Sequence, residues 1–148
     1  MIRLNRLSLL LIGLLISPLV LADDTVVGYV KTTTPQAVLV HNDTTTPAQI
    51  GSPVYAGTLI KTDDVGTLGL ALKDDTLLSF GPDTEFEISE YVFNPSEEQF
   101  KLSMKIVKGT LQYISGVISK LKPDAINLNT PTSIIGVRGT RFVVKVED

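Results

Sequence analysis

The chain has 148 residues, a length that suits one domain, and it contains no cysteine and no tryptophan. Its formal net charge of −3 at pH 7 argues against a nucleic-acid partner, because phosphates attract a basic surface. With one histidine and no cysteine, the chain cannot form a disulfide or the histidine and cysteine clusters that hold zinc. We expect no metal and no cofactor.

The N-terminal segment has the three parts of a secretory signal peptide. Arg3 and Arg6 are basic, residues 7–22 carry no charge, and Val20 and Ala22 are small residues of the kind found before a cleavage site. The uncharged run is shorter than the roughly 20 residues that cross a bilayer as a helix. We therefore predict cleavage after Ala22 and export to the periplasm, with an uncleaved membrane anchor as the alternative.

Removal of residues 1–22 would leave residues 23–148 as one mature domain. That domain of 126 residues holds 11 basic and 16 acidic residues, a net charge of −5. A chain of this size buries a core without the help of disulfides. Contact with a membrane is expected only through an uncleaved signal.

Short β-strands separated by turn residues are predicted throughout the mature domain. The first covers residues 25–31, and a second over residues 37–40 leads into a polar segment with a hairpin tip at Asn42-Asp43. Glycine, proline and aspartate then separate further short segments. Those strands are predicted over residues 55–62, 68–72, 77–80, 84–88, 91–93, 99–104 and 105–111, and residues 124–129 alternate apolar and polar side chains.

Two stretches have the clearest periodicity. Leucine occupies every second position of residues 68–72, which is typical of a strand with one buried face. Residues 113–121 are the one stretch with apolar side chains at helical spacing, although Gly116 weakens a helix there and Pro123 ends it.

The C-terminal stretch contains a set of residues that predict a turn. Pro131 fixes its own φ angle and keeps Thr130 extended, while Gly136 and Gly139 allow dihedral angles that other residues resist. A closing strand should follow, with alternate side chains on opposite faces. The predicted faces are Phe142, Val144 and Val146 on one side and Arg141, Val143 and Lys145 on the other.

Arg138, Gly139 and Thr140 are the candidate binding residues in this turn. The Arg138 guanidinium is suited to clamp a carboxylate, either one of this chain or one on a partner. The internal ion pair is the simpler interpretation. If it is right, substitution of Arg138 should lower the stability of the fold before it lowers the affinity for a partner.

Lys108 joins the candidate binding residues because its surroundings repeat those of Arg138. Residues 107–110 and 137–140 share the pattern valine, basic residue, glycine, threonine at an offset of 30 positions. Stacked coils of a β-solenoid would give such a repeat a physical cause, because equivalent corners need equivalent residues.

No stretch has a recognisable catalytic pattern. His41 lies in a polar loop, and the chain has neither a Gly-x-Ser-x-Gly motif nor a cysteine to act with it. Glu85 and Glu87 share one strand face and could act as acid and base, but a solvated face explains them more simply. Residues 136–140 lack the spacing of a phosphate loop. We predict that the protein is not an enzyme.

The C-terminal motif resembles the terminal signature of the FecR-like domain family. The resemblance rests on Thr130-Pro131-Thr132-Ser133, on Gly136-Val137-Arg138-Gly139-Thr140 and on Phe142, with weaker upstream matches over residues 59–62, 73–77 and 108–111. It covers about residues 25–146. It implies a β-rich coil on the outer side of the cytoplasmic membrane that relays or scaffolds protein contacts.

The chain departs from the iron-transport regulators that give this family its name. We expect it to lack both their cytoplasmic anti-sigma segment and the further C-terminal module that meets the transporter. Neither anti-sigma activity nor transporter contact is therefore carried over. Asp75 stands where the family favours a turn glycine, which predicts a looser turn.

The combined prediction is an all-β fold, built as a β-solenoid-like coil of short strands, with a β-sandwich as the alternative. The predicted function is that of a periplasmic accessory or sensory module that binds a protein partner in the cell envelope. The alternative is a glycan or peptidoglycan binding module, although its aromatic residues are scattered and tryptophan is absent. Those aromatic residues are Tyr29, Tyr55, Tyr91 and Tyr113.

Overall fold

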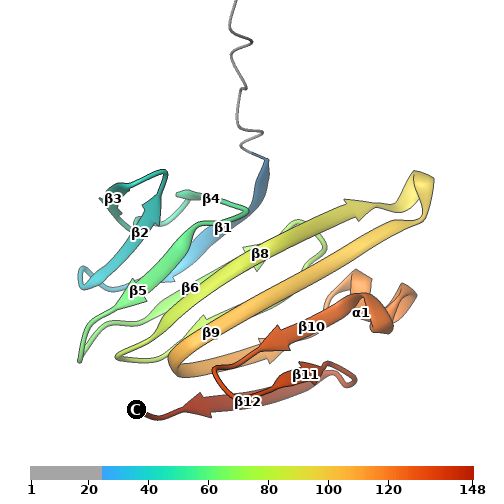
Figure 1. Cartoon of the computed structure of the whole chain (residues 1–148). Helices are drawn as coiled ribbons and strands as arrows, with labels where there is room; N and C mark the ends of the chain where they lie inside the picture. The colour runs from blue at the N-terminus through green and yellow to red at the C-terminus, as the bar shows by residue number, and fades with distance from the viewer. Residues whose placement is uncertain (1–24) are drawn as a thin grey trace, which may run out of the picture.

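The computed structural model describes residues 25–148 (Figure 1). The signal peptide predicted over residues 1–22 lies outside the described residues and stays a prediction. Within residues 25–148, no helix has the length and apolar character needed to span a bilayer.

Strands form most of the described chain, with one short α-helix and two 3-10 turns between them. The elements in order are β1 (Val26–Thr33), β2 (Ala37–His41), β3 (Thr44–Pro47), β4 (Pro53–Tyr55), β5 (Leu59–Thr62), β6 (Leu68–Leu72), β7 (Leu77–Phe80), β8 (Glu85–Asn94), η1 (Pro95–Glu97), β9 (Gln99–Ile114), α1 (Val117–Leu121), η2 (Pro123–Ala125), β10 (Ile126–Asn129), β11 (Ile134–Gly136) and β12 (Arg141–Val146).

The all-β prediction is confirmed, and the strands join in one curled sheet (Figure 1). The main path runs β3-β2-β5-β8-β9-β7-β6-β1-β4 through antiparallel pairs, with β10 and β12 also pairing to β9 and β11 pairing to β10. Among the strands of residues 25–148, the one parallel pair is that of β9 with β10. A solenoid-like coil is not confirmed, because a solenoid stacks parallel strands whereas these neighbours are antiparallel. The β-sandwich alternative is not confirmed either, because β9 makes the sheet continuous.

Strand β9 connects the two halves of the sheet. Its first part pairs with β8 and β10, its last six residues pair with β12, and its last four also pair with β7. Between these parts Gly109 has a φ angle of +97°, and a Cβ atom there would lie 2.2 Å from the Oγ1 atom of Thr84. Only glycine fits this bend. The two strands predicted over residues 99–104 and 105–111 are therefore one strand.

The register lines up buried side chains in rows across the sheet. All members of two such rows except Phe142 are at most 5 % exposed, and both rows belong to one hydrophobic core. Burying each such side chain stabilises the fold by roughly 1.5–3 kcal/mol. The rows are Val30, Leu70, Leu78, Tyr113 and Phe142 in one half, and Leu39, Ile60, Phe86 and Ile106 in the other.

Three local predictions were refined by the structure. The hairpin tip at Asn42-Asp43 is confirmed, with φ angles of 48° and 59°. Residues 44–47, expected as a polar loop, form the edge strand β3, where Pro47 is tolerated because an edge strand has no second neighbour. The helix predicted within residues 113–121 is confined to the five residues of α1, because Ile114 still pairs with strands on both sides.

Candidate functional site

The C-terminal strands leave two edges of the sheet open. Among the described residues, β12 pairs with β9 alone and β11 pairs with β10 alone. The two strands lie along one border of the sheet, close to the C-terminus (Figure 1). Their outer backbone groups are therefore available to a partner strand.

The hydrogen-bond pattern fixes which backbone groups of β12 are available. The Ser115 N–H donates to the Thr140 carbonyl at 2.9 Å, just before β12 begins. Pairs alternate in an antiparallel ladder, so Phe142 and Val144 direct their backbone groups to β9. The N–H and C=O groups that point to the open side belong to Arg141, Val143 and Lys145.

The side chains of β12 follow the predicted alternation. One set is partly buried against the core, and Phe142 stacks on the buried Tyr113 ring at 4.7 Å between centroids. The opposite set is exposed, and Val143 is 63 % exposed. The predicted division of the β12 side chains into two faces is thus confirmed, and the structure shows that the face of Phe142 is the inner one.

A tight turn positions β11 beside this edge. The Thr130 N–H donates to the Ser133 carbonyl at 2.8 Å, and the Ser133 N–H donates to the Thr130 Oγ1 atom at 3.0 Å. Pro131 occupies the second position of the turn, where its fixed φ is favourable. By the same alternation, Ile134 and Gly136 direct their backbone groups away from β10.

A groove of about 410 Å³ lies between this turn and the end of β12. Ile135, Val144 and Val146 supply apolar lining, and Lys145 and Glu147 supply charged groups. The Lys145 Nζ atom lies 2.9 Å from Glu147 Oε1. The hydrogen bond from that ammonium, followed by its charge, lowers the pKa of the Glu147 carboxyl. The groove therefore combines apolar surface with a polar rim.

Arg138 lies outside this groove, on the connection between β11 and β12. Its Nη2 atom is 2.7 Å from Asp124 Oδ1, so the guanidinium pairs with a carboxylate of its own chain. The two side chains are 78 % and 74 % exposed, and exposed pairs contribute about 0–1 kcal/mol. Gly139 has a φ angle of 141° in open space, and the Thr140 carbonyl anchors the start of β12.

Lys108 is not brought together with Arg138. It lies in β9 opposite Glu85, whereas Arg138 is close to Ile126, whose partner in β9 is Leu102. Six residues of strand separate the two positions, or about 20 Å. The repeated sequence pattern does not mark equivalent corners, because its first glycine packs into the sheet bend and its second lies in an exposed turn.

Asp74, in the turn between β6 and β7, carries a buried carboxylate that the sequence did not predict. The residue is 0 % exposed. Its Oδ1 atom accepts from Tyr91 Oη at 2.9 Å, and its Oδ2 atom accepts from Thr76 Oγ1 at 2.8 Å and from Ile118 N–H at 3.1 Å. Its carbonyl accepts from the Val117 N–H at 2.7 Å. We call Asp74, Thr76, Tyr91 and the start of α1 the Asp74 cluster.

The Asp74 cluster joins segments that are distant in the sequence. Tyr91 belongs to β8, 17 positions away, and Ile118 belongs to α1, 44 positions away. The turn aspartate with a threonine two residues later is a local signal of a side-chain turn. No local pattern reveals the two distant donors, which is why the cluster escaped prediction.

Two tyrosines near the cluster have perturbed hydroxyl groups. Burial, followed by the negative charge of Asp74, raises the pKa of both Tyr91 and Tyr113. The Tyr91 hydroxyl is satisfied, because it donates to Asp74 and accepts from the Asp74 N–H at 3.0 Å. The buried Tyr113 hydroxyl has no hydrogen bond of good geometry within the described residues.

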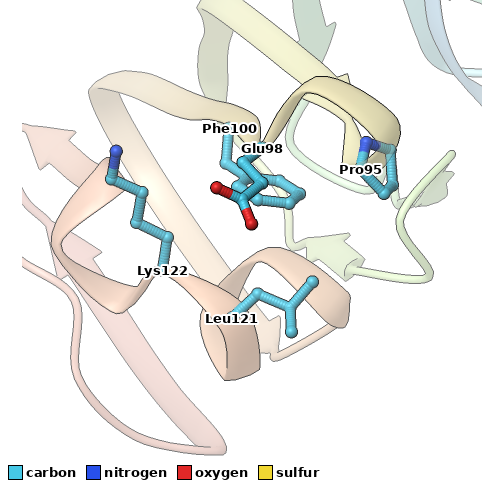
Figure 2. A pocket seen from close by; sticks show the side chains of 5 residues that line it. All are labelled: Pro95, Glu98, Phe100, Leu121 and Lys122. Atoms are coloured by element: carbon cyan, nitrogen blue, oxygen red, sulfur yellow. The ribbon is translucent and has the colours of Figure 1, made fainter.

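A second pocket, of about 420 Å³, lies between the tip of the β8–β9 hairpin and α1 (Figure 2). Figure 2 shows the Glu98 carboxylate next to the Phe100 ring and facing Leu121, while the Lys122 ammonium points away. Leu121 is 59 % exposed. The pocket has apolar surface but no converging set of polar groups, so its chemistry is less specific than that of the β12 edge. Its lining residues are Pro95, Glu98, Phe100, Leu121 and Lys122.

The carboxylates considered for catalysis lie on a face of mixed charge. Glu85 pairs with Lys61 at 3.4 Å and stands opposite Lys108, and Glu87 stands opposite Lys105. Cross-strand pairs of opposite charge stabilise a solvated face. In residues 25–148, no group of three or more histidine or acidic side chains could hold a metal ion.

The remaining candidates lie apart from one another. The His41 ring stacks on Tyr55 at 4.9 Å, and its Nδ1 atom lies 3.1 Å from Thr58 Oγ1. Tyr91 and Tyr113 belong to the interior around Asp74, and Tyr29 is 44 % exposed on β1. These tyrosines therefore do not form the aromatic platform that a glycan module would need.

Comparison with known protein families gives a match to the C-terminal part of the chain. A family model described as FecR protein matches residues 58–148, more than half of the chain, from just before β5 to the C-terminal residue. No curated protein and no solved structure matches the chain. The matched region contains both the Asp74 cluster and the open β12 edge.

Proposed function

The chain belongs to the FecR protein family, and from this membership we propose that it acts in cell-envelope signalling as a protein-binding module. In this proposal the module is periplasmic and serves as an accessory or sensor. The predicted signal peptide and the acidic balance of residues 23–148 support export and argue against nucleic acid as a partner. Neither catalysis nor a cofactor is part of the proposed role.

The observation that carries the proposal is the unpaired edge of β12. An open edge six residues long can accept an extended segment of another protein as an additional strand, with main-chain hydrogen bonds supplying affinity. Val143 is exposed at the middle of this edge, and the half-buried Val144 and Val146 border the neighbouring groove. The edge therefore offers both backbone and apolar contacts.

Site-specific photo-crosslinking in envelope preparations tests this proposal. A photoreactive residue at Val143 should give a discrete adduct with one partner protein, which mass spectrometry then identifies. Val65 is the matched control, because it is a valine of nearly the same exposure, 62 % against 63 %, in the loop between β5 and β6. We expect no adduct, or a different one, from Val65.

The opposite result would remove the proposal. If Val143 and Val65 give the same adducts, or neither gives any, the β12 edge is not a protein-binding surface. Saturable sedimentation with peptidoglycan, unaffected by substitution of Val143, would favour the glycan-binding alternative.

A further inference from the structure

We propose that the β12 edge selects an extended partner segment in which acidic side chains face Arg141 and Lys145 and apolar side chains lie between them. This inference rests on the proposed function, since it names the chemistry of the partner for the same surface. It follows from the backbone groups, the side chains and the charges of β12, taken in turn.

The backbone of β12 sets the length and register of the partner. Arg141, Val143 and Lys145 direct their N–H and C=O groups to the open side. A partner strand that satisfies these three residues pairs over five positions of β12. Antiparallel pairing is favoured, because its hydrogen bonds are perpendicular to the strands and slightly more stable per residue.

The outer side chains of β12 then define which residues fit opposite them. Directly opposed side chains share a face, so a partner residue opposite Arg141 meets a cation, and so does one opposite Lys145. Residues 141 and 145 are exposed, and no ion pair among the described residues involves Arg141. Lys145 pairs with the exposed Glu147 at 2.9 Å, so a partner carboxylate there shares or replaces that pair, and Arg141 supplies the larger part of the selectivity. A carboxylate at each of these two partner positions supplies the complementary charge.

The middle of the partner segment should be apolar. The position opposite Val143 meets a side chain that is 63 % exposed. The positions beside Phe142 and Val144 meet the partly buried face that packs on the core. The partner segment that fits therefore has five residues: an acidic residue at each end and three apolar residues between them.

The same charges disfavour a second copy of this chain as the occupant. Symmetric antiparallel pairing of two β12 strands about Val143 would place Arg141 of each copy opposite Lys145 of the other. Like charges directly opposite one another destabilise a strand pair, and charged side chains on an edge are a known guard against self-association. An acidic partner removes this conflict, whereas another β12 strand creates it.

Peptide binding to the purified protein, followed by fluorescence anisotropy, tests the inference. The probe is a labelled peptide with glutamate at the positions opposite Arg141 and Lys145 and valine at the three positions between them. A control peptide has lysine in place of both glutamates. We expect the glutamate peptide to bind about tenfold more tightly, because two opposed pairs change from attraction to repulsion.

Two substitutions identify the edge as the binding surface. Arg141→Glu should reduce or reverse the preference for the glutamate peptide, since it exchanges one attraction for a repulsion. Val143→Pro should abolish binding of both peptides, because it removes an N–H that points to the open side while leaving the bonds to β9 intact. Val144→Pro is the contrasting variant, which removes an N–H that points to β9 and should lower the melting temperature.

The inference is overturned if the two peptides bind equally, if neither binds, or if Val143→Pro leaves binding unchanged in a folded protein. A dimer in sedimentation velocity that Val143→Pro dissociates would also overturn it. The proposed function would survive these results as long as the Val143 crosslink still identifies a partner. If Val143→Pro does not fold, the effect of Arg141→Glu on the preference for the glutamate peptide is the deciding measurement.

Discussion

The Asp74 cluster and the Arg138 turn each place a charged side chain at a turn, and they differ in what surrounds it. Asp74 is fully buried and accepts hydrogen bonds from three segments, whereas Arg138 makes one ion pair with a neighbour that is equally exposed. Water competes for the charges of the exposed Arg138–Asp124 ion pair, whereas it does not reach the buried Asp74 carboxylate. The Asp74 cluster therefore contributes more to the stability of the fold than the Arg138 ion pair does.

The difference also separates two kinds of turn in this chain. The β6–β7 turn is fixed from inside, because Gly116 lies against it so closely that a Cβ atom would be 2.3 Å from the Asp74 carbonyl oxygen. The connection from β11 to β12 has open space around Gly136 and Gly139. A change at the first turn must therefore disturb several elements, and a change at the second disturbs few.

The largest effect is expected for Asp74→Ala. The substitution leaves the Tyr91 hydroxyl and the Ile118 N–H buried without their acceptor, and each such group costs about 1–3 kcal/mol. We expect a loss of roughly 4 kcal/mol in the free energy of unfolding, measured by urea denaturation. Asp75→Asn, at the exposed neighbour with a φ angle of 66°, is the control and should change it little. Equal losses for both variants would contradict the role of the cluster.

The two glycines of the repeated sequence pattern provide the next comparison. Gly109→Ala forces a Cβ atom against Thr84 at a positive φ angle and should cost about 3 kcal/mol or more. Gly139→Ala meets no neighbouring atom and should cost only about 1 kcal/mol, from its backbone angle alone. Thermal melts of the two variants side by side provide the measurement. A larger loss of stability for Gly139→Ala than for Gly109→Ala would contradict the conclusion that Gly109 is the tightly packed glycine and Gly139 the open one.

Alkaline pH should weaken the interior that surrounds the Asp74 cluster. The pKa values of Tyr91 and Tyr113 are raised above the ordinary 10.0, so both phenols stay protonated in the folded chain at a pH where the unfolded chain ionises. The unfolded state then binds fewer protons, and stability falls as the pH rises above 10 while it is fully present below. Each tyrosine contributes a slope of about 1.4 kcal/mol per pH unit.

Two phenylalanine substitutions separate these contributions. Tyr91→Phe and Tyr113→Phe should each remove one tyrosine's share of the alkaline slope, measured by denaturation between pH 9 and pH 11, a window chosen around the ordinary tyrosine pKa of about 10. At neutral pH, Tyr91→Phe should be destabilising because Asp74 loses a donor, and Tyr113→Phe should be nearly neutral because its hydroxyl makes no hydrogen bond of good geometry among the described residues. Similar neutral-pH losses for both variants would contradict the assignment.

The smallest effect is expected for Arg138→Ala. The ion pair with Asp124 is exposed on both sides, so its loss should change the free energy of unfolding by about 0.5 kcal/mol or less. Asp124→Ala should behave in the same way, and the double variant should show little coupling. A loss above about 2 kcal/mol for either single variant would show that the turn is as tightly held as the Asp74 cluster.

Local patterns in the sequence predicted local structure well. The alternation of β12, the leucines of β6 and the hairpin tip at Asn42-Asp43 depend on the spacing of neighbouring residues, and the structure confirms them. The turn at Thr130–Ser133 was likewise predictable, because proline and a threonine hydroxyl act within four residues.

What the sequence did not reveal depends on contacts between distant segments. The continuity of β9 through Gly109 follows from Thr84 on another strand, and the position of Asp74 follows from Tyr91 and Ile118. The sequence shows Arg138 between two glycines, but it does not show that the side chain is 78 % exposed and pairs with the similarly exposed Asp124. Burial is a property of the whole sheet and cannot be read from one motif.

Amide hydrogen exchange along β12, followed by NMR, tests the central claim most directly. The N–H groups of Arg141, Val143 and Lys145 should exchange rapidly in the free protein, while those of Phe142 and Val144, which point to β9, should be protected. Addition of the acidic peptide should then protect the first set. Uniform protection along β12 in the free protein, or no gain of protection with the peptide, would contradict an open edge that binds a partner strand.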